Sequence, residues 1–222
     1  MLVLALDTAT PASTAALVEV TADRLTGVAE RRTVDPRAHG EKLAPEIAAA
    51  LAQAGVRPRD LGAIVAGLGP GPYTGLRVGL ATAASMAQAL DIPAYGVCSL
   101  DGLGRAAGPG RVLVATDARR KEIYYAVYAD GERVTGPEVA KPADVVPIVA
   151  GQVDRIAGEG ALKYGDLFGV PVEEHLLYPP GAALVALAAA RIREGAPGEP
   201  LTPLYLRRPD AVEPAGRKSV LT

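Results

Sequence analysis

The chain predicts the same order of secondary-structure elements twice, and this repeat constrains its fold more than any other feature. In the first half, apolar periodicity and turn residues predict strand, strand, strand, helix, strand, helix and strand at residues 2–6, 13–20, 25–32, 41–54, 61–66, 73–90 and 94–97. In the second half they predict strand, strand, strand, helix, strand and helix at residues 112–116, 122–129, 133–138, 143–150, 153–157 and 181–194. A repeated β-β-β-α-β-α order predicts two α/β lobes with a cleft between them, divided near the glycine-rich residues 98–110.

Both halves place an aspartate directly after their first strand. Asp7 and Asp117 would face each other across the cleft, where paired carboxylates suit a hard cation or the magnesium of a nucleotide. A hairpin that grips phosphate needs glycine after the aspartate, because only then can backbone amides approach the phosphate. Here Asp7 is followed by Thr8 and Asp117 by Ala118, and Glu159 separates two glycines of a later loop. The sequence therefore favours a structural or hydrogen-bonding role for both aspartates and leaves ligand binding open.

A glycine- and proline-rich loop follows one predicted strand and opens the next helix, and it reads GLGPGPYTGLRVG over residues 67–79. Backbone N–H groups at such a helix start can hold an anion. The loop has no lysine after its glycines, and its prolines remove N–H donors, so it matches neither a Walker loop nor a dinucleotide-binding motif. The favoured alternative is a tight turn in which Thr74 caps the helix.

The helix predicted after this loop carries a small residue at every fourth position, at Gly75, Gly79, Ala83 and Ala87. Glycine inside a helix costs about 1 kcal/mol relative to alanine, so two retained glycines indicate close packing against another element. That element could be the helix's own sheet or a second subunit, and the spacing does not separate the two.

Composition excludes several classes of protein. The formal net charge is −2 and the apolar fraction is 49%, which is typical of a folded globular protein without an independent nucleic-acid-binding patch. The sequence shows no signal-peptide pattern and no uncharged apolar run of membrane-spanning length, which predicts a cytoplasmic protein. A single cysteine, Cys98, excludes an internal disulfide. The two histidines, His39 and His175, form no HxxxH pair and are predicted to be surface or capping residues.

Three motifs occur in order along the chain: LALDTATPASTAALVE at the start, GLGPGPYTGLRVGL in the middle and TDARRKEIYYAVY after the predicted division. Together they resemble the bacterial TsaB (YeaZ) family, and the later segment PLYLRRP is similar to its C-terminal pattern. The resemblance implies an α/β, actin-like ATPase (ASKHA, RNase H-like) fold with two lobes, each with a mixed sheet and flanking helices. The lobes would be residues 1–100 and 101–222, with a C-terminal tail that packs back on the first lobe.

The resemblance also implies a function. The family helps to make threonylcarbamoyladenosine beside the anticodon of ANN-decoding tRNAs, as a non-catalytic scaffold that pairs with its paralogue TsaD and is joined by the ATPase TsaE. The isolated chain is then expected to need no cofactor, to touch tRNA only through the complex, to touch no membrane, and to form a homodimer without TsaD. The alternative function is that of a small-molecule kinase or ATPase of the actin-like fold, and a metallopeptidase is a third hypothesis.

TsaD-type proteins carry an HxxxH metal motif just after the strand that follows the glycine-rich helix. The matching positions of this chain hold Ser99 and Leu103. Serine is a poor ligand for a transition metal and leucine is none. The resemblance therefore implies that this chain has no metal site and that ATP and metal belong to partner subunits.

The family pairs through helices of its N-terminal lobe, which correspond here to residues 41–54 and 73–90. The residues expected at the partner interface are Leu43, Ile47, Leu51, Gly75, Leu76, Gly79, Leu80 and Ala83. The residues expected to line the cleft or to touch a ligand there are Asp7, Gly69, Thr74, Asp117, Arg119 and Glu122. A leucine in place of Gly79 is expected to abolish pairing with TsaD while the fold stays cooperative.

Overall fold

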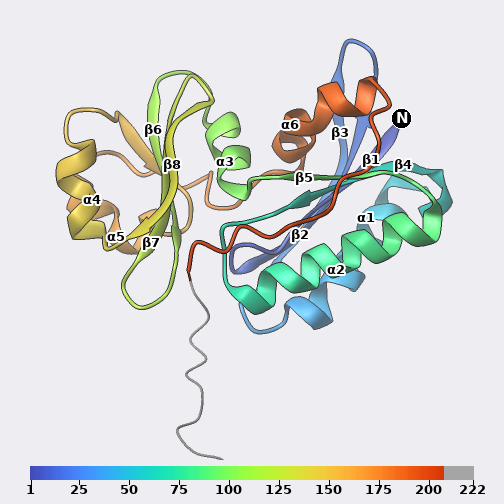
Figure 1. The fold of residues 1–222 in the computed structure, drawn as a ribbon, viewed down its shortest axis with the longest axis horizontal. Helices are drawn as coiled ribbons and strands as arrows, with labels where there is room; N and C mark the ends of the chain where they lie inside the picture. Colours follow the sequence, from blue (N-terminus) through green and yellow to red (C-terminus); the bar gives the residue numbers. More distant parts are fainter. Residues whose placement is uncertain (208–222) are drawn as a thin grey trace, which may run out of the picture.

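The computed structural model describes residues 1–207 and contains two mixed sheets with flanking helices (Figure 1). The first sheet has the strand order β3-β2-β1-β4-β5, with bounds Leu25–Val34, Ala12–Val20, Leu2–Asp7, Leu61–Gly67 and Ala94–Val97. Strand β1 pairs antiparallel with β2 and parallel with β4. All the strands predicted for the first half are therefore present.

The second sheet repeats this arrangement. Its order is β8-β7-β6-β9, with bounds Glu132–Ala140, Ile123–Ala129, Arg111–Asp117 and Arg155–Ala157. Strand β6 pairs antiparallel with β7 and parallel with β9, as β1 does with β2 and β4. The duplication predicted from the order of elements is confirmed.

Helices cover both faces of the first sheet. Helices α1 (His39–Ala54) and α2 (Tyr73–Leu90) pack on one face, and α6 (Gly181–Arg193) packs on the other (Figure 1). Helix α1 ends where Gly55 takes a left-handed conformation with φ of 68°, which glycine adopts without strain. Helix α6 belongs to the second half of the sequence, so that half contributes a covering helix to the first sheet.

Residues 98–110, predicted as a hinge-like divide, instead contain helix α3 (Ser99–Ala107). The sequence pattern did not predict this helix, because the glycines in it lower its helix propensity. At Gly104 glycine serves packing, since a Cβ there would lie 2.2 Å from Cδ1 of the Tyr128 ring. Helix α3 thus lies directly on the second sheet and joins its core through Leu100 and Leu103.

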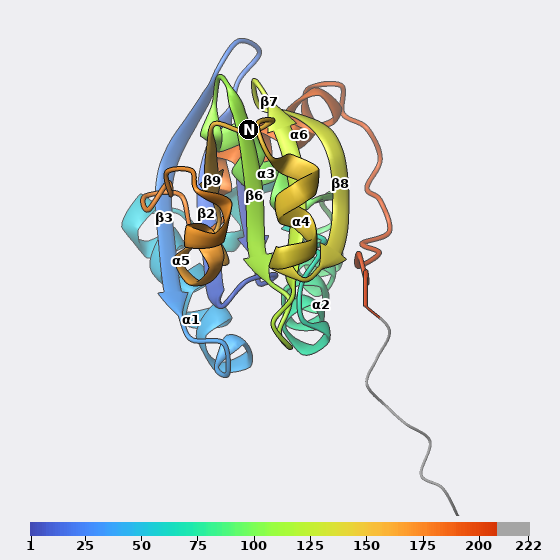
Figure 2. The ribbon, with the colours of Figure 1, turned by 90° about the vertical axis from the view of Figure 1, so that its left-hand side faces the viewer.

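Short helices cover the other face of the second sheet. Helix α4 (Pro142–Val149) and helix α5 (Ala161–Tyr164) lie in front of the sheet in Figure 2, and the 3-10 turn η2 (Gly165–Phe168) follows them. A further 3-10 turn, η1 (Pro58–Asp60), precedes β4.

The segment after α6 runs back along the first sheet. The N–H of Glu199 donates to the carbonyl of Ala94 at 2.8 Å, and the N–H of Leu204 donates to the carbonyl of Leu68 at 2.8 Å. Within residues 1–207, no helix combines the length and the hydropathy needed to cross a membrane.

Candidate functional site

Asp7 lies buried where β1 ends, with 1% of its surface exposed. Its Oδ2 accepts a hydrogen bond from Ser99 Oγ at 2.5 Å, and its Oδ1 accepts one from the Ala9 N–H at 3.0 Å. Burial raises the pKa of Asp7 to about 6, although these hydrogen bonds favour the charged form. Asp7 therefore ties β1 to the start of α3 and is closed to solvent, in keeping with the structural role favoured from the sequence.

The glycine-rich loop packs on the turn between β1 and β2, and this contact explains its glycines. A Cβ at Gly67 would lie 1.8 Å from Asp7 Oδ2, and one at Gly71 would lie 2.3 Å from the carbonyl oxygen of Ala9. The N–H of Gly69, a residue expected in the cleft, donates to Ser99 Oγ at 3.1 Å, and its carbonyl accepts from the Ser99 N–H at 2.7 Å. Gly69 is thus engaged inside the lobe.

The small-residue face of α2 also points inward. Thr8 Oγ1 donates to the carbonyl of Gly75 at 2.8 Å and accepts from the N–H of Gly79 at 3.1 Å. A Cβ at Gly79 would lie 2.3 Å from Thr8 Oγ1. The sequence left open whether this face packs on its own sheet or on a second subunit. In the structure it packs within its own lobe. A leucine at Gly79 would therefore strain the packing inside the first lobe, so a loss of pairing in that variant would not by itself identify a partner contact.

The eight residues expected at the partner interface share one property, which is burial in the first lobe: Leu43, Ile47, Leu51, Gly75, Leu76, Gly79, Leu80 and Ala83. Apolar and small positions at helical spacing had marked the core-facing side of both helices. These side chains cannot touch a partner in this conformation. Other residues are exposed on the helix pair, among them Glu41, Lys42, Ala44, Pro45, Ala48, Ala52 and Gln53 of α1, and Arg77, Ala81, Ala84, Ser85, Gln88 and Ala89 of α2.

Ser99 and Leu103, the two positions expected to correspond to the histidines of TsaD-type proteins, both serve the fold. Ser99 is 1% exposed and donates to Asp7, and Leu103 is fully buried in the core of the second sheet. Among the described residues, no group of three or more His, Cys, Asp or Glu side chains lies close enough together to hold a metal ion.

Asp117 and Glu122, both expected in the cleft, are held by nearby cations or amides. Asp117 Oδ1 accepts from the Arg119 N–H at 3.1 Å, and its Oδ2 lies 3.5 Å from Lys163 Nζ. Glu122 pairs with Arg207, so it anchors the C-terminal segment instead.

Glu159, which sequence reasoning treated only as an interruption between glycines, lies at this site too. Its Oε1 accepts from the Asp117 N–H at 2.8 Å, and burial raises its pKa to about 7. The nearby hydroxyl of Thr116 is buried and has no hydrogen-bond partner among the described residues.

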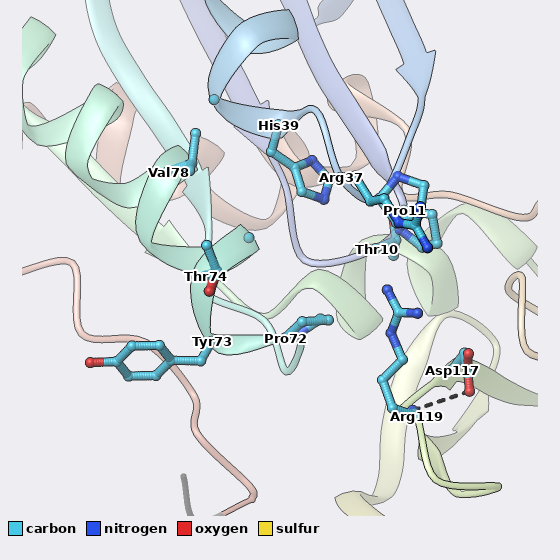
Figure 3. Close-up of a pocket in the computed structure, with 13 residues that line it drawn as sticks. Thr10, Pro11, Arg37, His39, Pro72, Tyr73, Thr74, Val78, Asp117 and Arg119 are labelled. Atoms are coloured by element: carbon cyan, nitrogen blue, oxygen red, sulfur yellow. Dashed lines mark hydrogen bonds between the residues drawn. The ribbon is translucent and has the colours of Figure 1, made fainter. Parts of the chain in front are cut away.

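A cavity of about 530 Å³ lies between the first lobe and the turn after β6 (Figure 3). The residues that line it are Thr10, Pro11, Pro36, Arg37, His39, Gly40, Pro72, Tyr73, Thr74, Gly75, Val78, Asp117 and Arg119. Three of the expected cleft residues meet here: Thr74, Asp117 and Arg119. The predicted capping role of Thr74 is wrong, because Pro72 is the N-cap of α2 and Thr74 is the second residue of the helix.

His39 was predicted at the surface or as a cap, but it is 8% exposed and stands in the first turn of α1. Its Nδ1 lies 2.9 Å from Ser13 Oγ, and burial lowers its pKa below the usual range. Figure 3 shows the ring directed into the space beside Thr74. Sequence reasoning missed this residue because nothing near it in the chain suggests a site.

Comparison with known proteins fits this architecture. The family model described as "TsaD: tRNA N6-adenosine threonylcarbamoyltransferase" matches residues 27–196. The tRNA threonylcarbamoyladenosine biosynthesis protein TsaB of Escherichia coli is 30% identical over 224 residues, which cover 93% of this chain and 95% of that protein. The chain belongs to the TsaB (YeaZ) family.

Two further proteins match this chain over similar lengths. An uncharacterized protein of Mycobacterium tuberculosis is 50% identical over 209 residues, which cover 94% of this chain and 93% of that protein. The solved structure of YeaZ from Pseudomonas aeruginosa superposes with a TM-score of 0.74 at 31% identity, covering 92% of this chain and 99% of that one. The actin-like fold of two mixed sheets with flanking helices, predicted from the sequence, is confirmed.

Proposed function

We propose that this chain is a non-catalytic subunit in the biosynthesis of threonylcarbamoyladenosine beside the anticodon of ANN-decoding tRNAs. It acts in the cytoplasm by pairing with TsaD, and TsaE joins the pair. The Escherichia coli relative that matches nearly the whole chain bears the name of this biosynthesis. One structural observation carries the non-catalytic part of the proposal, namely the hydrogen bond from Ser99 to Asp7.

This hydrogen bond stands where a TsaD-type protein would place a metal ligand. The Ser99 hydroxyl is directed at a buried carboxylate, and it also accepts the N–H of Gly69. Leu103, at the second ligand position, contributes only hydrocarbon to the core. Neither side chain offers a donor to a transition metal, so this chain supports a catalytic partner and does not carry out the transfer itself.

The exposed sides of α1 and α2 are the partner surface in this proposal. Each exposed side carries several small side chains among charged and polar residues: Ala44, Ala48 and Ala52 on α1, and Ala81, Ala84 and Ala89 on α2. Small side chains let a second helix approach closely, and apolar area removed from water contributes about 25 cal/mol per Å². Without TsaD, a second copy of the chain occupies the same surface, and tRNA is bound only by the whole complex.

Co-purification with TsaD tests this surface. Ala81 and Ala84 are exposed on α2, so Ala81→Arg with Ala84→Arg adds bulk and charge without touching the core. The matched control is Ala190→Arg on α6, an exposed alanine on the opposite face of the sheet. We expect the double variant to lose TsaD while the control retains it. Equal retention by both proteins would remove α2 from the interface.

The alternative is a kinase or ATPase of the same fold, and the cavity beside α2 is the observation in its favour. Calorimetry with Mg-ATP, followed by a phosphate-release assay, separates the two functions. The scaffold proposal predicts no turnover by the isolated chain. Multiple turnovers that disappear in Asp117→Asn would support the alternative.

A further inference from the structure

Within residues 1–207, the chain crosses between the two lobes three times. It leaves strand β5 of the first sheet for helix α3 on the second sheet, and it returns to the first sheet between β9 and α6. It crosses again after α6, where residues 195–207 run along the first sheet and end against the second lobe (Figure 1). We call residues 195–207 the strap. Neither sheet needs this third crossing, since strands β1 to β9 all precede it.

The strap begins on the first lobe, where several hydrogen bonds hold it. Nη1 of Arg191, on α6, lies 2.6 Å from both carboxylate oxygens of Glu199. The Tyr95 hydroxyl donates to the carbonyl of Ala196 at 2.5 Å. The side chain of Leu201 packs against the core of the first sheet. The first part of the strap therefore belongs to the first lobe.

The strap passes to the second lobe at Leu204. The N–H of Leu204 donates to the carbonyl of Leu68 in the first lobe at 2.8 Å, whereas its side chain packs against the core of the second sheet. Further along, Nη1 of Arg207 donates to the carbonyl of Ala118 at 2.7 Å, and the same guanidinium pairs with Glu122. Both of these partners lie beside the turn after β6. The two ends of the strap are thus held by different lobes.

The lobes also touch through α3 and α6, away from the end of the strap. A Cβ at Gly102 of α3 would lie 2.6 Å from Cδ2 of Leu184 on α6, so the two helices are in close contact. Figure 1 shows this pair of helices near the top and the end of the strap lower down, beside the start of α2. There Tyr205 stacks on Tyr73, the first residue of α2, with the ring centroids 5.0 Å apart. A rotation of the lobes about the contact between α3 and α6 would therefore break the contacts at the end of the strap.

We propose that the strap fixes the angle between the two lobes. Lobes usually turn on a few hinge residues, and here such a turn must also separate Arg207 from Glu122. These side chains are only 22% and 28% exposed, and a partly buried charge that loses its partner is costly. The angle also sets the width of the cavity, which Thr74 lines from one lobe and Arg119 from the other. The inference concerns the chain alone and goes beyond the proposed function.

Electron–electron double resonance on the full chain tests the proposal. Nitroxide labels at Gln53→Cys on α1 and Ala143→Cys on α4 report the distance between the lobes from exposed positions, and an excess of unlabelled chain suppresses distances between copies. The native Cys98 is buried, so the label reacts at the introduced cysteines. We expect one narrow distance distribution when the strap is intact. The double variant Tyr205→Ala with Arg207→Gln should give a distribution about twofold broader.

The matched control is Arg155→Gln. Arg155 forms an ion pair of similar burial with Glu173 and donates to two backbone carbonyls, but all of these partners lie within the second lobe. This variant should leave the distance distribution unchanged, as should Tyr205→Phe, which keeps the stacked ring. An unchanged width in the double variant, or equal broadening in Arg155→Gln, would overturn the proposal. So would a broad distribution in the chain with an intact strap.

Hydrogen exchange provides a second readout on the same proteins. In the double variant the Leu204 N–H should exchange faster, while the amides of β1 and β6 keep their protection. Loss of protection throughout both strands would also overturn the proposal, because the strap would then hold each sheet folded and would not act on the angle between them. None of these results depends on whether the chain pairs with TsaD.

Discussion

Ser99 Oγ lies 2.5 Å from Asp7 Oδ2, and this contact joins the end of the first strand to the start of the helix that leads into the second sheet. Both residues are 1% exposed. The contact connects segments far apart in the sequence. It is a structural link between the two sheets' segments.

Removing the Ser99 hydroxyl should destabilise the fold. In Ser99→Ala the buried carboxylate of Asp7 loses a donor, and the Gly69 N–H loses its acceptor. A buried polar group left without its partner costs about 1–3 kcal/mol. Urea unfolding should show a loss of that size, whereas Ser85→Ala, at an exposed position of α2, should leave stability unchanged. Equal stability of the two variants would contradict the role given to Ser99.

Asp7 should make stability fall as pH rises from about 4 to about 6. Its pKa is about 6 in the folded chain against 3.8 as the ordinary value, so the folded state binds more protons in that window. The difference corresponds to about 3 kcal/mol of unfolding free energy, present at low pH and lost by about pH 6. Asp7→Asn removes this titration, while Glu159 titrates in both proteins. Parallel pH profiles for the variant and the unmodified chain would contradict the burial of a titrating Asp7.

The glycines that pack against the end of β1 and the turn after it should not tolerate a side chain. In Gly67→Ala the new Cβ would lie 1.8 Å from Asp7 Oδ2, and Gly79→Leu would place its Cβ 2.3 Å from Thr8 Oγ1. Overpacking of this kind typically costs about 1–3 kcal/mol. The matched control is Gly40→Ala in the first turn of α1, where nothing lies within 4 Å of the new Cβ. Thermal unfolding should lower the Tm of the first two variants and leave that of the control equal or higher.

Much of the fold could be predicted from the sequence because its elements are strongly patterned. The apolar runs that end in Asp7 and Asp117 indicated the duplicated strands, and β1 and β6 lie there. Helix α3 was missed because Gly102 and Gly104 weaken its helical pattern, although both allow close packing on neighbouring side chains. Apolar periodicity predicts a helix or strand well only when the intrinsic propensities of the residues favour the same element.

The candidate site was harder to predict, because burial decides which side of a helix is available. Leu43 and Leu80 each belong to a row of apolar residues at helical spacing. That spacing does not show whether the core or a partner covers the row, and in the structure the core covers both residues. The cavity was also out of reach of motif reasoning. The residues that line it come from four separate segments, around Thr10, Arg37, Thr74 and Arg119, which only the folded chain brings together.

Reconstituted modification of an ANN-decoding tRNA by TsaD and TsaE, supplied with an activated threonylcarbamoyl donor, with and without this chain, tests the central claim most directly. The account predicts that threonylcarbamoyladenosine forms only when the chain is present, and that the chain without TsaD forms none. It also predicts that the variant with Ala81→Arg and Ala84→Arg fails to support the reaction, whereas Ala190→Arg supports it fully. Full modification without the chain, or transfer by the chain alone, would contradict a required, non-catalytic partner.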